Sequence, residues 1–318
     1  MLTSSNIAFG DQLGAQMGTL AEMYFLAKEN NQQLVFYREM RNFRRRFLVD
    51  ETFDLGDKIS WIGSDHVWWV NLYTRQFLKN DGPLHNFDRM YKNRLLYILD
   101  QILIRGVMLK HRNFVPLNDM RGGRHCDSRL LTLTDGDYDI RSGFGGVQDW
   151  GKYTSDVLDM YLFRENIVSE GERIWQKLPH VKPYVSVHFR RSDYLVMASL
   201  NLNLDYYREA LQNFDREKYT LLVFSDDIGY CKQLDIFAGW DVYFASHNSA
   251  AVDMYLMSKC ENHIIANSSF SFWGAFLSKR YDNHGLTICP YSFLGSHEDT
   301  QNSVNGYWYP DDWKAIHV

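Results

Sequence analysis

The chain has 318 residues, which is enough for two domains that each bury a core. Hydrophobic residues make up 45% and charged residues 23%, the balance of a soluble globular protein rather than a disordered one. The net charge of −5 argues against nucleic acid as the main ligand, because proteins that bind a phosphate backbone carry a broad basic surface. Any anion site must therefore be local.

The first residues lack a basic segment followed by an apolar one, and no apolar run approaches the length of a membrane span. We therefore expect a cytoplasmic protein, with peripheral contact at the inner membrane face as an open alternative. The four cysteines are scattered without a CxxC pair, a spacing that favours neither a zinc site nor a disulfide framework.

A short strand is predicted at residues 6–9, followed by the loop GDQLG and a helix. Leu20, Met23, Tyr24 and Ala27 recur at helical spacing and mark the buried face of that helix. The glycines allow a close approach of the backbone to a ligand, or simply form a tight turn. The loop is not a phosphate-binding loop of known type, because neither Gly-Lys-Ser/Thr nor GxGxxG is present.

Five arginines lie between residues 38 and 46. Two interpretations stay open: a solvated face, or contact with an anionic membrane surface or a lipid-linked diphosphate acceptor. Residues 61–107 contain tryptophans and then a long amphipathic pattern, which predicts helices. The aromatic content of 15% fits either core packing or stacking on sugar rings.

Alternating aspartates from Asp135 to Asp139 resemble the start of a calcium loop. Ile140 stands where such a loop needs glycine, and Gly146 stands where it needs glutamate. We therefore expect a turn with solvated carboxylates. In the glycine-rich segment that follows, Gln148 is either a ligand for a sugar hydroxyl or an ordinary loop residue.

From about residue 179 strands and helices alternate regularly. Strands are predicted at 184–189, 220–224, 241–245, 263–266 and 286–289, and helices at 205–214, 228–237, 250–260 and 269–280. This repetition predicts a parallel sheet. We therefore expect an N-terminal domain over 1–178 and an α/β domain over 179–318.

Polar residues follow each of the first four strands of this domain. They are His188, Arg190 and Arg191; Ser225, Asp226 and Asp227; Ser246, His247 and Asn248; and Asn267, Ser268 and Ser269. In parallel sheets ligands bind beyond the carboxyl ends of the strands. Four such strand ends together predict a nucleotide-binding site.

Arg190 and Arg191 are the main candidates for binding its phosphates. Neighbouring guanidiniums need anionic partners when they are buried, and their planar forks match phosphate oxygens. A diphosphate is the expected partner. The alternative is a surface loop with ordinary ion pairs, in which Asp193 is one partner.

Asn267, Ser268, Ser269 and Phe270 open a predicted helix, which offers free amides, a positive dipole end and hydroxyl donors to a phosphate. The alternative role for a serine here is to cap the helix.

Asp253 lies in the predicted helix 250–260, where a carboxylate can accept two hydrogen bonds from guanine or simply complement the helix dipole. The adjacent Asp226 and Asp227 suggest a metal site. We favour none, because the arginines already supply positive charge and no DxD pair accompanies them.

Four segments, in this order and spacing, resemble the bacterial α-1,2-fucosyltransferases of glycosyltransferase family 11. They are HFRRSDY (188–194), FSDD (224–227), DMYLMSKC (253–260) and ANSSFSFWGAFL (266–277). The resemblance is strong over about 184–290 and weaker at GDQLGAQM and GFGGVQDWGKY. It does not cover about 35–140.

The resemblance implies a GT-B-like α/β enzyme with two Rossmann-like domains, the N-terminal one for the acceptor and the C-terminal one, with a parallel sheet, for GDP-fucose. Such an enzyme transfers L-fucose with inversion to O-2 of a terminal galactose, in polysaccharide or oligosaccharide synthesis. It requires no metal or other cofactor. The implied partners are GDP-fucose and a galactose-terminated glycan, either free or lipid-linked.

The matching motifs also imply residue roles. Arg190 and Arg191 bind the diphosphate and stabilise its departure, with His188 near the nucleotide and Asp193 bracing the loop. Asp253 reads guanine. The remaining expected donor contacts are Ser225, Asp226, Asn267, Ser268, Ser269 and Phe270, and the expected acceptor contacts are Gln12, Gln16, Gln148 and Trp150.

Asp11 is the candidate general base, because it lies on a glycine-flanked loop that can face a cleft; the alternative is a turn carboxylate. The chain departs from the family pattern at three places. Asp11 and Gln12 replace paired glycines, Ser192 replaces a glycine, and Phe272 replaces a tryptophan.

Two other functions stay open. Another GDP-sugar transferase, of the α-1,6 or O-fucosyl type, shares HxRR-like loops, although the segments LMSKC and SSFSFWG favour family 11. A carbohydrate-binding protein without catalysis predicts glycan binding and no nucleotide affinity, and it leaves the polar strand ends unexplained.

Overall fold

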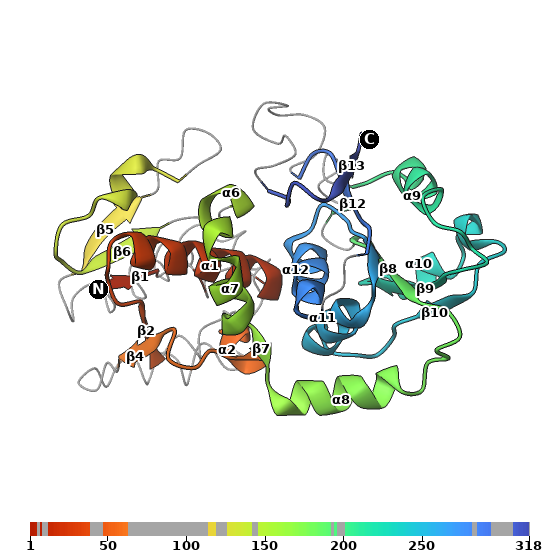
Figure 1. Cartoon of the computed structure of the whole chain (residues 1–318), viewed down its shortest axis with the longest axis horizontal. Coiled ribbons are helices and arrows are strands. Elements are labelled where there is room, and N and C mark those ends of the chain that lie inside the picture. The colour runs from red at the N-terminus through yellow and green to blue at the C-terminus, as the bar shows by residue number, and fades with distance from the viewer. Residues whose placement is uncertain are drawn as a thin grey trace, which may run out of the picture. The chain divides into compact units, whose positions relative to one another are not determined.

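The computed structural model describes residues 1–4, 7, 12–38, 47–62, 114–118, 126–141, 146–191, 194–195, 201–281, 285–293 and 308–317. The chain divides into two compact units (Figure 1). Unit 1 comprises Met1–Gly145 and Asp149–Leu162, and unit 2 comprises Gly146–Gln148 and Phe163–Val318. The domain boundary expected after residue 178 stays a prediction. Helix α8 (Glu165–Trp175) groups with unit 2.

Unit 1 is built on short parallel strands and one long buried helix. Its strands are β1 (Leu2–Thr3), β2 (Val35–Tyr37), β3 (Phe53–Asp54), β4 (Ser60–Ile62), β5 (Val115–Asn118) and β6 (Tyr138–Arg141). Its helices are α1 (Leu13–Glu29), α2 (Leu48–Thr52), α7 (Thr154–Met160) and the 3₁₀ helices η2 (Ser128–Leu131) and η3 (Gly151–Tyr153). Strands β1, β6 and β5 form a parallel sheet in the order β1-β6-β5, and β2 pairs with β4. Two short elements, α6 (Val147–Trp150) and β7 (Leu162–Phe163), lie where the units divide.

Helix α1 confirms the predicted buried face, since Leu20, Met23, Tyr24 and Ala27 are all buried. Its other faces are buried too, including Gln16 and Glu22. A helix enclosed on all sides needs polar partners for such groups, which periodicity alone does not reveal.

Unit 1 departs from the predicted elements and burial at several positions. The strand expected at 6–9 falls almost wholly outside the described residues, and the first strand is Leu2–Thr3. The helix expected from residue 61 is wrong at its start, because Trp61 lies in β4, while 63–107 is outside the described residues. The expectation of solvated carboxylates is wrong for Asp139. It is 1% exposed because its strand, β6, is enclosed between β1 and β5.

Unit 2 contains a six-stranded parallel sheet in the order β10-β9-β8-β11-β12-β13. The strands are β8 (Tyr184–Phe189), β9 (Thr220–Ser225), β10 (Val242–Phe244), β11 (Asn262–Ile264), β12 (Thr287–Pro290) and β13 (Lys314–Ile316). The helices besides α8 are α9 (Leu204–Leu211), α10 (Ile228–Cys231), α11 (Ala250–Lys259) and α12 (Ser269–Leu277), with 3₁₀ helices η5 (Asp235–Phe237) and η6 (Ser278–Tyr281). Two α/β units, each built on parallel strands, confirm the predicted GT-B-like class.

The helices of unit 2 cover both faces of its sheet, with α9 on one face and α11 and α12 on the other (Figure 1). Strand β8 is buried along its whole length because it lies inside the sheet and is covered on both sides. This arrangement explains its nearly continuous apolar sequence, which is typical of parallel sheets.

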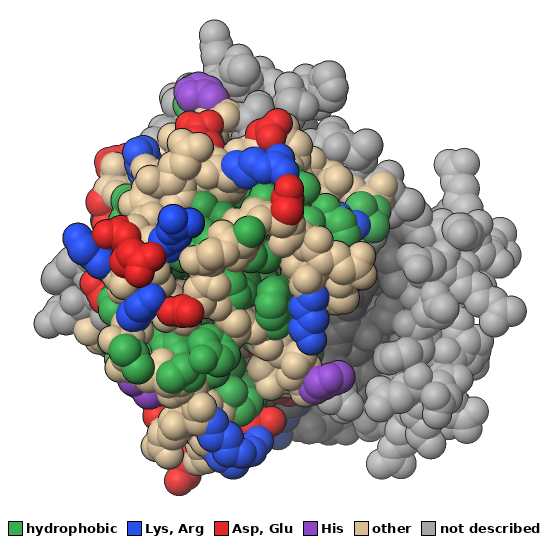
Figure 2. Space-filling view, turned by 90° about the vertical axis from the view of Figure 1, so that its right-hand side faces the viewer, with side chains coloured by type: hydrophobic (Ala, Val, Ile, Leu, Met, Phe, Trp, Pro, Cys, Tyr) green, Lys and Arg blue, Asp and Glu red, His purple; other side chains and the backbone are tan. Residues whose placement is uncertain are grey.

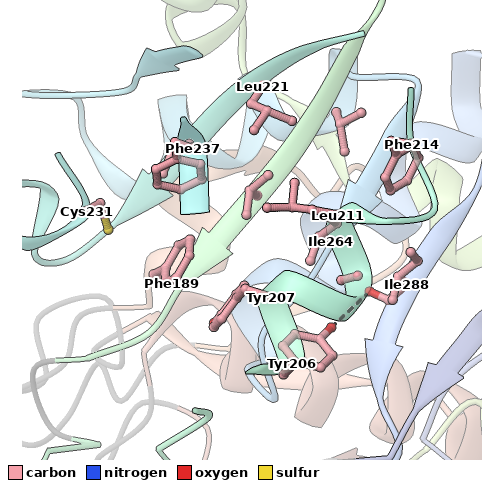
Figure 3. Packing of buried hydrophobic residues seen from close by; sticks show 14 of the residues in the cluster. Phe189, Tyr206, Tyr207, Leu211, Phe214, Leu221, Cys231, Phe237, Ile264 and Ile288 are labelled. Carbon is pink, nitrogen blue, oxygen red and sulfur yellow. Dashed lines mark hydrogen bonds between the residues drawn. The ribbon is translucent and has the colours of Figure 1, made fainter. Parts of the chain in front are cut away.

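Aromatic residues of α9 pack this helix against the centre of the sheet (Figure 3). The ring of Tyr207 stacks on Phe189, the last residue of β8, with centroids 3.8 Å apart. The Tyr206 hydroxyl donates to the carbonyl of Ile265 at 2.6 Å, just beyond β11. The carboxyl ends of β8 and β11 are therefore held by neighbouring residues of one helix.

The single helix predicted at 228–237 is wrong. The chain forms α10 and η5 instead, separated by Leu234, whose backbone is extended with φ −79° and ψ 130°. Strand β13, at Lys314–Ile316, was not predicted; it adds to the edge of the sheet by pairing with β12.

None of the described helices combines the length and the apolar character that crossing a membrane requires. All four cysteines are buried and free. Figure 2 views the molecule from the right-hand side of Figure 1, where basic and acidic side chains of the described residues intermingle around exposed apolar ones. Arg208, for example, pairs with Asp205 and Asp235.

Helix α8 packs on α11 through Gly171, and this contact tests the packing of unit 2. A Cβ atom at Gly171 would lie 2.2 Å from the Tyr255 ring, which is held by a hydrogen bond to Glu172. We expect Gly171→Ala to destabilise the protein by about 1–3 kcal/mol, although helix propensity alone favours alanine by about 1 kcal/mol. Chemical denaturation measures the change, with Ser169→Ala on the exposed face of α8 as the matched control. A Gly171→Ala protein as stable as the control would contradict the packing.

Candidate active site

The order of strands in unit 2 creates a switch point beside β8. The chain adds β9 and β10 on one side of β8 and then crosses to add β11, β12 and β13 on the other. Ligands of such sheets bind where the strand order reverses, beyond the carboxyl ends. The predicted phosphate-binding residues follow β8 and β11, the two strands that border this point.

Arg190 leaves β8 and forms an ion pair with the strand next to it. Its Nη1 lies 2.8 Å from Oδ2 of Asp226, which directly follows β9. Both side chains are about one-fifth exposed, at 18% and 21%. The Arg190 guanidinium also lies 5.7 Å from the ring centre of Tyr194.

Arg191 is held by three groups from the chain that follows β9. Its backbone N–H donates to Oδ1 of Asp226 at 2.9 Å, and its Nε donates to Oδ2 of Asp227 at 3.3 Å. The guanidinium carbon lies over the ring of Tyr230, 3.3 Å from the ring centre. Each of the twin arginines is therefore paired with one of the twin aspartates.

Asp227 makes hydrogen bonds through both its side chain and its backbone N–H. Its Oδ1 accepts the N–H of Tyr230 at 3.1 Å and so caps helix α10. Its own N–H donates to the Ser225 hydroxyl at 2.9 Å. The predicted donor contact Ser225 thus supports the carboxylate that holds Arg191, and Asp226 is bonded to both arginines.

His188 lies in β8, one residue before its end, and is 4% exposed. Burial, together with the charge of Arg190, lowers the pKa of His188 to about 3, so the imidazole is neutral near pH 7. Its backbone carbonyl accepts the Tyr207 hydroxyl at 3.1 Å, and its ring lies 5.5 Å from that of Phe270. His188 and Phe270 are therefore close together, and their roles as donor contacts stay predictions.

The start of helix α12 follows β11, one of the two strands at the switch point. Ser268 occupies the N-cap position, with φ −134° and ψ 128°, but its side chain makes no capping hydrogen bond. Helix geometry leaves the N–H groups of the first turn, from Ser269 to Ser271, without helical acceptors. The Tyr194 hydroxyl donates to the carbonyl of Asn267 at 3.0 Å, which ties the chain after the arginines to this turn.

Asp253 lies in the first turn of α11, which follows β10 at the same edge of the sheet. Asn248 donates from Nδ2 to Oδ1 of Asp253 at 2.9 Å, and Ser249 caps the helix by accepting the N–H of Val252. Burial raises the pKa of Asp253 to about 6, which the Asn248 hydrogen bond opposes.

The predicted acceptor residues occupy different environments. Gln12, just before α1, and Gln148, in α6, are exposed. Gln16 is fully buried and accepts the N–H of Val49 at 3.4 Å, and Trp150 is 1% exposed. The sequence did not reveal that Gln16 and Trp150 are buried. Their roles in acceptor binding stay predictions.

Asp11, Asp193 and Ser192 lie outside the described residues, as do four of the five clustered arginines. Phe272 is described and buried; it packs against Trp313 with ring centroids 5.3 Å apart. An aromatic residue other than tryptophan thus fills this position.

A buried group of potential metal ligands occurs in unit 1. Atoms of Glu22, Cys126 and Asp149 lie within 4.8 Å of one another. The Asp149 carboxylate already accepts the Cys126 N–H at 3.1 Å and 3.3 Å, so hydrogen bonding explains its burial without an ion.

Sequence reasoning missed the roles of Asp227 and Tyr230 beside Arg191. The available signal was FSDD followed by an aromatic residue, directly after the strand that pairs with β8. The sequence indicates these aspartates only as metal ligands or, for Asp226, as a donor contact, and it indicates Asp193 as one partner of the arginines.

Comparison with known proteins agrees with these motifs. Residues 162–313 match the model of glycosyl transferase family 11. The chain is 32% identical over 317 residues to the O-antigen biosynthesis glycosyltransferase WbnK of Escherichia coli, covering 93% of this chain and 96% of that protein. It is 45% identical over 117 residues to an alpha-1,2-colitosyltransferase of Escherichia coli, covering 33% and 39% of the two chains.

A solved structure, that of the fucosyltransferase NodZ from Bradyrhizobium, aligns with a TM-score of 0.49 at 15% identity, covering 87% of this chain and 93% of that one. The near full-length relationship to the Escherichia coli O-antigen enzyme, together with the family model over unit 2, shows that the chain belongs to glycosyl transferase family 11.

Proposed function

We propose that this glycosyltransferase moves L-fucose from GDP-fucose to O-2 of a terminal galactose, with inversion, during synthesis of a surface polysaccharide or oligosaccharide. The observation that carries the proposal is the placement of Arg190 and Arg191 at the switch point of a parallel sheet, with an uncapped helix start on the neighbouring strand. The relatives support an α-1,2 linkage and a role in O-antigen synthesis, since one is an alpha-1,2-colitosyltransferase and another an O-antigen biosynthesis glycosyltransferase.

The arginines suit the chemistry of the leaving group. Breaking the bond between fucose and phosphate develops negative charge on GDP and positive charge on the sugar ring. Guanidiniums that are already held in place stabilise that negative charge without reorganisation during the reaction. The first-turn amides of α12 and the Ser268 hydroxyl add donors from the opposite side of the switch point.

Asp253 is proposed to recognise the base. An ionised carboxylate accepts hydrogen bonds from the ring N–H and the exocyclic amine of guanine, whereas a protonated one does not accept both. Asn248 occupies only Oδ1 in this structure, so Asp253 retains capacity to accept.

A metal ion is not needed in this proposal, because Arg190 and Arg191 supply the positive charge that a divalent cation supplies in other nucleotide sites. We propose Asp11 as the base that takes the proton of the acceptor hydroxyl. Gln12 and Gln148 are the proposed acceptor contacts whose amides are exposed. A lipid-linked acceptor and peripheral membrane contact belong to the proposal as well.

The reaction is tested by GDP release in the presence of chelator, with and without a β-galactoside-terminated oligosaccharide. GDP-fucose, GDP-mannose and nucleotide-activated colitose are compared, because one relative is a colitosyltransferase. We expect acceptor-dependent release from GDP-fucose, and analysis of the product then gives the linkage and anomeric configuration. Nucleotide release from activated colitose but not from GDP-fucose would show that fucose is not the sugar transferred. Dependence of the reaction on an added metal would contradict the metal-free mechanism.

Arg190→Ala tests the diphosphate role. We expect turnover to fall by about 10²-fold or more, because a preorganised charged donor at the leaving group is lost. Arg208→Ala is the matched control, since Arg208 also pairs with aspartates in unit 2 but lies on the α9 surface. Both variants are first checked for folding by circular dichroism. Near-normal turnover in Arg190→Ala would remove the proposed role.

The pKa of Asp253 predicts a pH dependence of GDP binding. The carboxyl is ionised above its pKa of about 6, so affinity is full above that pH and falls as the pH drops through it, by about tenfold per pH unit at the limit. Titration calorimetry of wild type and Asp253→Asn from pH 5 to 8 measures this effect. Phosphate titration contributes equally to both proteins, so the difference reports the Asp253 carboxyl, and parallel pH profiles would contradict the role in base recognition.

A further inference from the structure

Arg191 is enclosed by Tyr230 and Asp227 on two different sides. The ring of Tyr230 covers one face of the guanidinium, and Asp227 engages the Nε edge. Within the described ranges, the terminal Nη1 and Nη2 atoms of Arg191 make no hydrogen bond, so this fork has donors to offer. The Arg191 side chain is 18% exposed, so it is not fully enclosed.

The two arginines of the pair differ in this respect. Arg190 uses Nη1 for its ion pair with Asp226, and its contact with the Tyr194 ring is looser, at 5.7 Å. Arg191 instead uses Nε, and its terminal nitrogens bond to none of the described residues. A guanidinium binds two phosphate oxygens at once only when its plane is correctly oriented, so the group that sets the plane of Arg191 matters.

Tyr230 is well fixed for that task. Its N–H donates to Oδ1 of Asp227, while Oδ2 of the same carboxylate accepts from Arg191. One side chain therefore sets both the start of helix α10 and the position of the arginine. The Tyr230 hydroxyl makes no hydrogen bond in the part of the chain that the structure describes, so its contribution here comes from the ring face.

We propose that Tyr230 is a positioning residue for the donor: its ring holds the guanidinium plane of Arg191 so that Nη1 and Nη2 face the diphosphate of the bound GDP-sugar. This inference rests on the proposed function, in which Arg191 binds that diphosphate. Cation–π contact of this kind orients a guanidinium and compensates for part of its lost hydration.

The test measures GDP affinity by titration calorimetry in the full-length protein. Tyr230→Leu removes the ring face but keeps an apolar side chain, and we expect its Kd for GDP to rise about tenfold. Tyr230→Phe and Tyr230→Trp retain a face and should bind GDP within about twofold of wild type. If Tyr230 acted through its hydroxyl, or only by filling space, GDP affinity would not be retained in both Tyr230→Phe and Tyr230→Trp.

Tyr219→Leu is the matched control. Tyr219 is another partly buried tyrosine that packs against the same core as Tyr230, through an edge contact with Phe214 at 5.6 Å. We expect this variant to bind GDP normally. Should Tyr230→Leu fail to fold, Tyr230→Met provides a second side chain without a planar face.

A double-mutant cycle separates this inference from the proposed function. In an Arg191→Met background, Tyr230→Leu should cause no further loss of GDP affinity, because the ring acts through the guanidinium. Wild-type GDP affinity in Arg191→Met would refute the diphosphate role itself. Two results would overturn the positioning role of Tyr230 while Arg191→Met binds GDP weakly. The first is normal GDP affinity in Tyr230→Leu, and the second is an equal loss of affinity from Tyr230→Leu in the wild-type and Arg191→Met backgrounds.

Discussion

Two neighbouring guanidiniums at the end of a buried strand repel each other, and their partial burial is costly unless anionic groups pair with them. In this protein the anions come from the adjacent strand, since Asp226 and Asp227 directly follow β9 and pair with Arg190 and Arg191. Because β8 and β9 are in register up to Phe189 and Ser225, the pairing forms as a consequence of the sheet. The ion pairs and the sheet thus fix each other, and the loop that carries the arginines has its position before any ligand arrives.

The aspartates leave the arginines suited to a diphosphate. Carboxylates compensate for the positive charge and hold one edge of each guanidinium, while the terminal nitrogens of Arg191 bond to none of the described residues. In the proposed function, a multiply charged diphosphate adds to a preorganised group instead of ordering a mobile one, which lowers the entropic cost of binding. The same arrangement serves the proposed reaction, because preorganised donors stabilise charge that develops as GDP leaves.

Unit 2 distributes recognition over several strand ends. The phosphate-binding candidates follow β8 and β11 at the switch point, and Asp253 lies on the helix after β10. Helix α9 supports this edge from beneath, since Tyr207 bonds to the His188 carbonyl and Tyr206 to that of Ile265.

Local sequence determined most elements of unit 2, but not the break between α10 and η5 or strand β13. It also determined the identity of most site candidates. The apolar run 184–189, its abrupt change to arginines, and the helix predicted at 250–260 are short-range patterns that are readable without the fold. Tertiary structure decided which groups meet. The pairing of Arg191 with Asp227 and Tyr230 depends on β9 lying beside β8, and the burial of Gln16, Trp150 and Asp139 depends on what covers them. Neither fact is encoded in local periodicity, because strand order and enclosure arise from contacts between residues distant in the chain.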